Sequence, residues 1–267
     1  MTEHPVAPPS VWWGRYTLEE GLTGRWRVGA LTLWAQRRPG EWRLAHASTN
    51  DPFDDEVASQ VPSAEPIPSH GATLVRYAMK HTDRFLALEP ALPDRPVVSR
   101  PDTPFYVLAG EEVRLFISTP VWVRVLAGAR RLLEIPVYRP SDTWFGPSTR
   151  EGEVCYDTRT SCRNELSQVP RRPHRAVAAV TIRNRTGDAV LVERLNLPVP
   201  YLAVYAAPGG GLWTQGVTLQ MGGDGGSAEL HIGKGAPAEA HGATLLTGPR
   251  EDADRNILVR ALSALIG

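Results

Sequence analysis

Short runs of alternating apolar and polar residues recur along most of the chain, and 24 glycines and 24 prolines punctuate them. The clearest runs cover residues 113–117, 122–126 and 132–138, which follow one another closely. Alternation with a period of two is typical of strands with one buried face, and glycine and proline mark the turns between them. The pattern predicts an all-β fold, mainly an antiparallel β-sandwich of many short strands.

Near the N-terminus the alternation continues from residue 25 to residue 36 and returns over residues 42–46 after a Pro39-Gly40 turn. We expect these two segments to pair as a hairpin. The following residues 50–69 are acidic and rich in proline, which favours a loop.

The last residues change period. Ile257, Leu258, Leu262 and Leu265 recur at helical spacing, and acidic residues precede them, as the helix dipole favours. The sequence therefore predicts a β unit over residues 11–249 and a C-terminal amphipathic helix over residues 250–267. The β unit has long connections near 95–104 and 139–153, so two packed subdomains are an alternative. The helix could dock on the sheet or on a partner.

Charge and composition argue against several classes of protein. The 29 basic residues equal the 29 acidic residues, and 42% of the chain is hydrophobic. This balance argues against disorder and against a nucleic-acid-binding surface. No run approaches the roughly 20 apolar residues of a membrane span, so no direct membrane insertion is expected. The N-terminus lacks the pattern of a signal peptide, and two cysteines are too few for a disulfide scaffold. We expect a cytoplasmic protein.

Motifs of reaction chemistry are few. The chain has no phosphate-binding loop, no nucleophile elbow and no spaced histidine or cysteine ligands, so we predict no catalytic residues, no metal and no cofactor. Cys155 and Cys162 are expected to be buried thiols on opposite faces of a strand. The acidic run 51–56 and the basic run 171–175 are expected to be solvated loops.

Two segments carry more aromatic and charged side chains than simple loops need. Trp12 and Trp13 follow a proline-rich terminus, and they either plug one end of the sandwich or anchor a partner. A later connection combines four candidate binding residues with a Gly-Pro bend, and it is either a structural turn or the wall of a groove. These four residues are Asp142, Trp144, Arg150 and Glu151.

Together these segments resemble a known family. Residues 12–16 (WWGRY), 142–147 (DTWFGP) and 197–202 (LPVPYL) resemble the prokaryotic family of uncharacterised proteins known as domain of unknown function 432. The resemblance extends over residues 11–235. It implies no established activity and no catalytic residues. It does imply an association with genes of small mechanosensitive channels, and hence an accessory or regulatory role.

The leading hypothesis is a non-enzymatic cytoplasmic binding protein that contacts another protein, such as a mechanosensitive channel complex, or a second copy of itself. One alternative is a module that binds a small ligand or carbohydrate through rim tryptophans. Another is a hydrolase-like enzyme with a site that no motif reveals, because triads can be assembled from distant residues.

Overall fold

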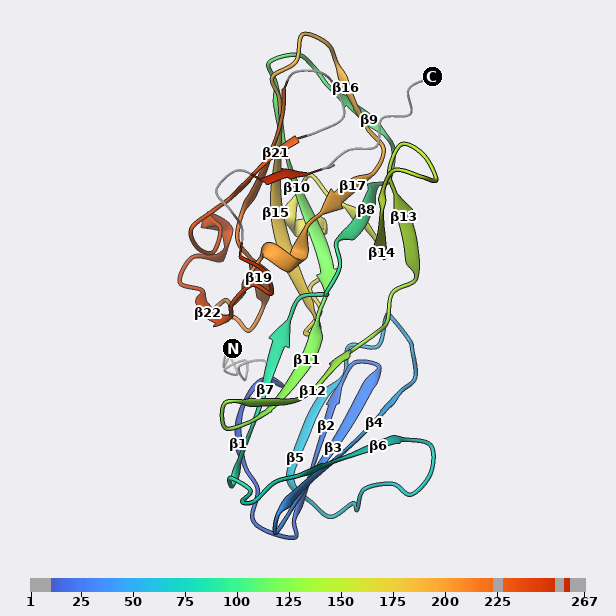
Figure 1. The fold of residues 1–267 in the computed structure, drawn as a ribbon. Helices are drawn as coiled ribbons and strands as arrows, with labels where there is room; N and C mark the ends of the chain where they lie inside the picture. Colours follow the sequence, from blue (N-terminus) through green and yellow to red (C-terminus); the bar gives the residue numbers. More distant parts are fainter. Residues whose placement is uncertain (1–10, 223–227, 253–256, 260–267) are drawn as a thin grey trace, which may run out of the picture.

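The computed structural model describes residues 11–222, 228–252 and 257–259 of the 267-residue chain. These residues form twenty-three strands and three single-turn 3-10 helices, which confirms the predicted all-β class (Figure 1). The 3-10 helices are η1 (Leu166–Gln168), η2 (Val199–Tyr201) and η3 (Ala238–Ala240). Among the described residues, no helix is long and apolar enough to cross a membrane.

Two antiparallel sheets occupy the end of the molecule drawn lowest in Figure 1. The five-stranded sheet has the order β5 (Val57–Ser63), β2 (Thr23–Val28), β3 (Leu31–Arg38), β4 (Glu41–Ser48) and β6 (Thr73–Ala78). The four-stranded sheet has the order β1 (Gly14–Thr17), β7 (Phe85–Ala91), β11 (Trp122–Ala127) and β12 (Arg130–Pro136).

The remaining strands lie at the other end. The largest sheet has the order β22 (Thr244–Thr247), β18 (Val204–Ala206), β19 (Leu212–Thr214), β15 (Arg175–Asn184), β20 (Val217–Met221), β21 (Ala228–Ile232) and β23 (Ile257–Val259), and β10 (Glu112–Pro120) also pairs with β15. A second sheet has the order β13 (Asp142–Phe145), β14 (Glu153–Cys162), β8 (Val97–Pro101) and β17 (Leu195–Leu197). The short strands β9 (Phe105–Val107) and β16 (Val190–Val192) pair with each other.

The chain passes between the two ends without long loops. Only Val121 separates β10 from β11, and its backbone is held by hydrogen bonds with His174 and Val137. One hydrophobic cluster includes core residues from both ends, for example Trp26 and Leu88 at one end and Ile182 and Leu219 at the other. The expected division into subdomains stays a prediction.

The expected N-terminal hairpin is part of a three-stranded meander, because residues 25–36 contain a turn that was not predicted. Residues 25–36 are two strands, β2 and β3, joined by a turn at Gly29-Ala30, where Gly29 has a φ of 51°. This left-handed conformation favours glycine. The buried positions change phase across this turn, from Trp26 and Val28 to Leu31 and Leu33, so residues 25–36 are not one continuous alternation. The predicted return strand is confirmed as β4, whereas residues 50–69 contain β5 and are not a simple loop.

The C-terminal helix is a prediction that the structure contradicts where it describes the chain. Residues Ile257–Val259 form β23, which pairs antiparallel with β21 in the register Glu229↔Leu258. The candidate partner-helix residues Ile257 and Leu258 are therefore in a strand, while Leu262 and Leu265 lie outside the described residues. A helix of this length is only marginally stable by itself, whereas a strand at the edge of β21 gains interstrand backbone hydrogen bonds.

Candidate binding face

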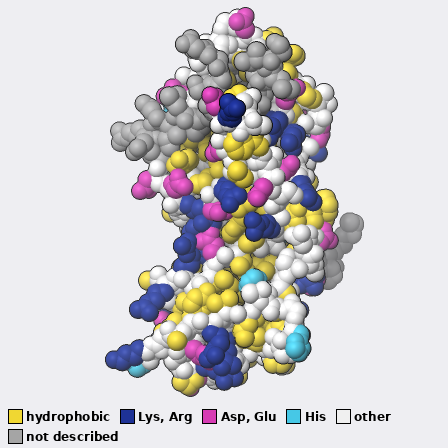
Figure 2. Space-filling view, turned by 45° about the vertical axis from the view of Figure 1, so that its right-hand side comes forward, with side chains coloured by type: hydrophobic (Ala, Val, Ile, Leu, Met, Phe, Trp, Pro, Cys, Tyr) yellow, Lys and Arg dark blue, Asp and Glu magenta, His cyan; other side chains and the backbone are white. Residues whose placement is uncertain are grey.

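The hairpin β13–β14 carries the exposed aromatic residue of the predicted site. Trp144 lies directly opposite Val154 in the antiparallel register, so their side chains share one face. Trp144 is 40% exposed and Val154 is 45% exposed, although both are large and apolar. The view in Figure 2 brings forward the side of the molecule on which β13 lies, and hydrophobic side chains there are interspersed with basic and acidic ones. We call Trp144 and Val154 the hairpin pair.

The loop between the two strands is closed by its own hydrogen bonds. The Trp144 indole Nε1 donates to the carbonyl oxygen of Ser148 over 2.7 Å. The Ser148 hydroxyl accepts hydrogen bonds from the backbone N–H groups of Arg150 and Glu151. A Cβ at Gly146 would lie 2.1 Å from the Glu151 carbonyl oxygen, so only glycine allows this approach. The loop therefore holds the Trp144 ring in a fixed orientation.

Asp142 lies at the other end of β13 beside a second aromatic group. Its Oδ1 is 3.4 Å from Nη1 of Arg95, whose guanidinium lies 5.4 Å from the centre of the Tyr156 ring. The Tyr156 hydroxyl donates to Asp94 Oδ1 over 3.0 Å, and burial raises the pKa of Tyr156 above its ordinary value. The hairpin pair therefore has charged and polar groups along its border, an arrangement common at the rim of protein interfaces.

Arg194 covers the outer edge of β13. The backbone N–H of Asp157 donates to Ser141 O, so alternate residues of β13 face β14 and the Trp144 carbonyl points away from it. Arg194 Nη2 donates to this carbonyl over 2.6 Å, and its guanidinium lies 5.3 Å from the Phe145 ring centre. Because this outward carbonyl is occupied, addition of a strand at this edge is disfavoured, and we expect a partner to contact the hairpin through its side chains.

The N-terminal tryptophans occupy a different place from Trp144. Trp12 is fully buried, and its indole Nε1 donates to Pro173 O over 2.8 Å. Its ring meets the half-buried Trp13 ring edge-on at 5.6 Å. Trp12 is therefore part of the core, as the plugging alternative expects, and is not accessible to a partner. The structure does not bring either residue to the hairpin pair by any contact among the described residues.

The basic and acidic runs meet each other, which corrects the expectation that both are simple solvated loops. Arg172 donates to Phe53 O and lies 3.6 Å from a carboxylate oxygen of Asp55. His174 is only 1% exposed. Burial, together with the positive charges of Arg175 and Arg172, lowers the pKa of His174 to about 4. The sequence could not show that the two runs meet, because 119 positions separate Phe53 from Arg172.

Arg175 is buried without an ion pair among the described residues. Its Nε donates to Ser118 Oγ over 2.8 Å, and its Nη2 donates to Ser118 O over 2.6 Å and to Thr158 O over 3.2 Å. Burial lowers the pKa of Arg175 to about 10, so the guanidinium stays charged near neutral pH. Neutral carbonyl and hydroxyl groups therefore solvate this charge, and it fixes β10, β14 and β15 together.

The cysteines are buried free thiols, as predicted. They belong to different hydrophobic clusters, Cys155 beside Phe145 and Cys162 in the main core. Burial raises the pKa of Cys155 to about 12 and that of Cys162 to about 11. Neither thiol is ionised near neutral pH, and a thiol rather than a thiolate is a poor nucleophile and metal ligand.

We expect the native protein to react with a thiol reagent at pH 8 at least about a hundredfold more slowly than the unfolded protein, because both burial and the raised pKa suppress the thiolate. Absorbance of the released chromophore measures the rate. Rapid reaction of one thiol in protein that is folded by circular dichroism would contradict this placement of the cysteines.

No group of three or more histidine, cysteine, aspartate or glutamate side chains could hold a metal ion in the part of the chain that the structure describes. A family model described as a protein of unknown function (DUF432) matches residues 12–266. The resemblance noted in three sequence segments is thus confirmed over nearly the whole chain. No curated protein and no solved structure matches the chain.

Proposed function

Because the chain belongs to the DUF432 family, whose function is unknown, we propose a function from the surface: a non-enzymatic binding protein that contacts another protein through the hairpin pair. The observation that carries the proposal is the 40% exposure of Trp144 and the 45% exposure of Val154 on one face of a rigid hairpin. Exposed tryptophans are enriched among the residues that dominate binding energy at protein interfaces.

The surroundings of the hairpin pair support this function. The Trp144–Ser148 hydrogen bond holds the ring before any partner arrives, so little conformational entropy is lost on binding. Asp142, Arg150 and Glu151 provide a charged rim, which contributes to orientation and specificity more than to affinity. Thus the four residues selected from this connection have distinct roles, with Trp144 as the anchor.

We further propose that the partner is a membrane protein complex, such as a mechanosensitive channel, and that the protein contacts its cytoplasmic face. Support comes only from the gene association that the family resemblance implies. We also propose that the sheets pack as β-sandwiches, because side chains of the five-stranded sheet (Trp26) and of the four-stranded sheet (Leu88) share one core cluster.

Substitution of the hairpin pair tests the proposed function. We expect Trp144→Ser to weaken partner binding by roughly 30-fold, a typical loss for an interface anchor. Val154→Asp should have a similar effect while leaving the Trp144–Ser148 hydrogen bond in place. The measurement is affinity capture from separate membrane and soluble fractions of host cells, with quantification by mass spectrometry and a titration of the captured protein.

Leu245→Asp is the matched control, because Leu245 is 59% exposed on β22, away from the hairpin. It should capture the same partner as the natural protein. If Trp144→Ser and Val154→Asp both retain full binding while remaining folded, the hairpin pair is not the binding face.

A further inference from the structure

The strand β6 is an edge strand with an unusually open outer side. It closes the five-stranded sheet beside β4. Of its six residues, Thr73, Leu74, Arg76 and Ala78 are exposed, and Val75 and Tyr77 are half-buried. The aliphatic side chain of Leu74 is 50% exposed. An exposed edge of this length and composition is a template for pairing with another strand.

The hydrogen-bond pattern shows which backbone groups of β6 point outward. The Met79 N–H donates to Gly40 O, so the pair Gly40–Met79 continues the β4–β6 ladder as a hydrogen-bonded pair. Because such pairs alternate in an antiparallel ladder, Val75 directs its N–H and C=O groups toward β4. The N–H and C=O groups of Leu74, Arg76 and Ala78 therefore point away from the sheet.

Within the described part of the chain, no group forms a hydrogen bond with these outward N–H and C=O groups. The strand also contains no proline or lysine, the residues that commonly protect sheet edges. Two other sheet edges of the molecule differ from this one. Pro62 interrupts β5 at the opposite edge of the same sheet, and Arg194 occupies the outward carbonyl of β13. The outer edge of β6 has neither of these two protections.

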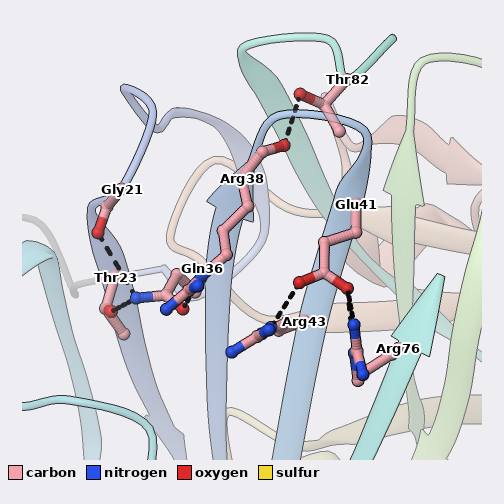
Figure 3. A network of polar contacts seen from close by, with 8 residues as sticks. All are labelled: Gly21, Thr23, Gln36, Arg38, Glu41, Arg43, Arg76 and Thr82. Carbon is pink, nitrogen blue, oxygen red and sulfur yellow. Dashed lines mark hydrogen bonds and ion pairs between the residues drawn. The ribbon is translucent and has the colours of Figure 1, made fainter. Parts of the chain in front are cut away.

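The one charge on β6 is paired within the sheet, with a carboxylate that it shares with Arg43. Arg76 donates to Glu41 Oε2 through Nε over 2.9 Å and through Nη2 over 2.6 Å (Figure 3). Glu41 Oε1 in turn accepts from Arg43 Nε over 2.6 Å, and the hydrogen bond from Arg76 lowers the pKa of Glu41. Arg76 therefore repels a neighbouring strand less than a free guanidinium would.

We propose that a second copy of this chain pairs with β6, antiparallel and about a two-fold axis through Val75. In this register Leu74 of one copy faces Arg76 of the other as a hydrogen-bonded pair, so the outward groups of both strands bond to each other. Val75 faces Val75 of the second copy, and Thr73 faces Tyr77. The two five-stranded sheets become one sheet across the interface.

The strand is complementary to itself in this register, which supports a second copy as its partner. The register through Val75 satisfies three conditions. The outward backbone N–H and C=O groups of one strand meet those of the other, and side chains on one face of the sheet lie beside side chains on the same face. In addition, no two arginines are directly opposite. A register centred on Arg76 would place two guanidinium groups face to face, which destabilises a strand pair. This surface is separate from the hairpin pair, and its test does not depend on the proposed function.

Two variants at one position separate backbone pairing from side-chain effects. Arg76→Pro removes the outward N–H but no bond to β4, and edge strands tolerate proline in this orientation. Arg76→Thr removes the same guanidinium but keeps the N–H. We expect the full chain and Arg76→Thr to form dimers by sedimentation analysis, and Arg76→Pro to raise the dimer Kd at least about tenfold. Circular dichroism checks the fold, and Leu74→Pro replaces Arg76→Pro if the latter unfolds.

A cysteine pair tests the register. Cα atoms in a non-hydrogen-bonded antiparallel pair are about 4.5 Å apart, within the range of a disulfide. Val75→Cys should therefore form a disulfide-linked dimer under mild oxidation, whereas Leu74→Cys should not, and Cys155 and Cys162 are buried. The proposal is overturned if the chain is monomeric at about 100 μM, if folded Arg76→Pro and Leu74→Pro dimerise as the full chain does, or if only Leu74→Cys cross-links.

Discussion

Replacement of Arg175 by leucine is expected to lower the free energy of unfolding by roughly 3–5 kcal/mol, because several buried polar groups lose their hydrogen-bond donor together. Arg175 is only 5% exposed. Without it, the carbonyl oxygens of Ser118 and Thr158 remain buried without this donor. Each such loss costs about 1–3 kcal/mol, and leucine can return only part of the packing.

Arg183→Leu on the same strand is the matched control. Its side chain is 41% exposed and pairs with Glu112 over 2.8 Å, so its loss should cost less than about 1 kcal/mol. Chemical denaturation of both variants measures the difference. Equal stability of Arg175→Leu and the natural protein would show that the buried guanidinium does not hold β10, β14 and β15 together.

Acidification is expected to destabilise the protein through His174 between pH 6.5 and about 4. The folded pKa of about 4 lies below the ordinary value of 6.5, so the unfolded chain binds a proton in this range and the folded chain does not. The contribution of neutral His174 to the free energy of unfolding is fully present above pH 6.5. It falls by up to about 1.4 kcal/mol per pH unit as the pH decreases, to a total loss of roughly 3 kcal/mol.

The variant His174→Gln should flatten this dependence, since glutamine cannot take up the proton. Burial also lowers the pKa of His46, so a smaller slope of the same sign should remain. His231→Gln, at an exposed position, should keep the natural slope. Denaturation at several pH values from 4.5 to 7 measures the slopes. An unchanged slope in His174→Gln would assign the pH dependence to other groups.

In the hairpin β13–β14, the local sequence indicates a candidate site but not its geometry. The aromatic residues, the Gly-Pro bend and the charges of residues 142–153 are contiguous, so composition is enough to distinguish this connection from a simple loop. The exposure of Trp144 and the protection of the β13 edge could not be predicted, because they depend on Val154 across the hairpin and on Arg194 from a distant segment.

The open edge of β6 has no sequence signal, because its six residues alternate as any strand does. The order of strands in a sheet decides which strand is last, and this order is a long-range property. Trp12 shows the opposite case. Its aromatic neighbours indicate an important position, but only its hydrogen bond to Pro173 shows that the importance lies in the core.

The all-β class and the family of this protein follow from its amino-acid sequence, because a period of two is a local property and the family's motifs are contiguous. The conformation of residues 257–259 and the burial of the basic run depend instead on long-range contacts. Apolar spacing is shared by a short helix and an edge strand, and pairing with β21 selects the strand. The burial of Arg175 likewise depends on Ser118, which lies 57 residues away in the chain.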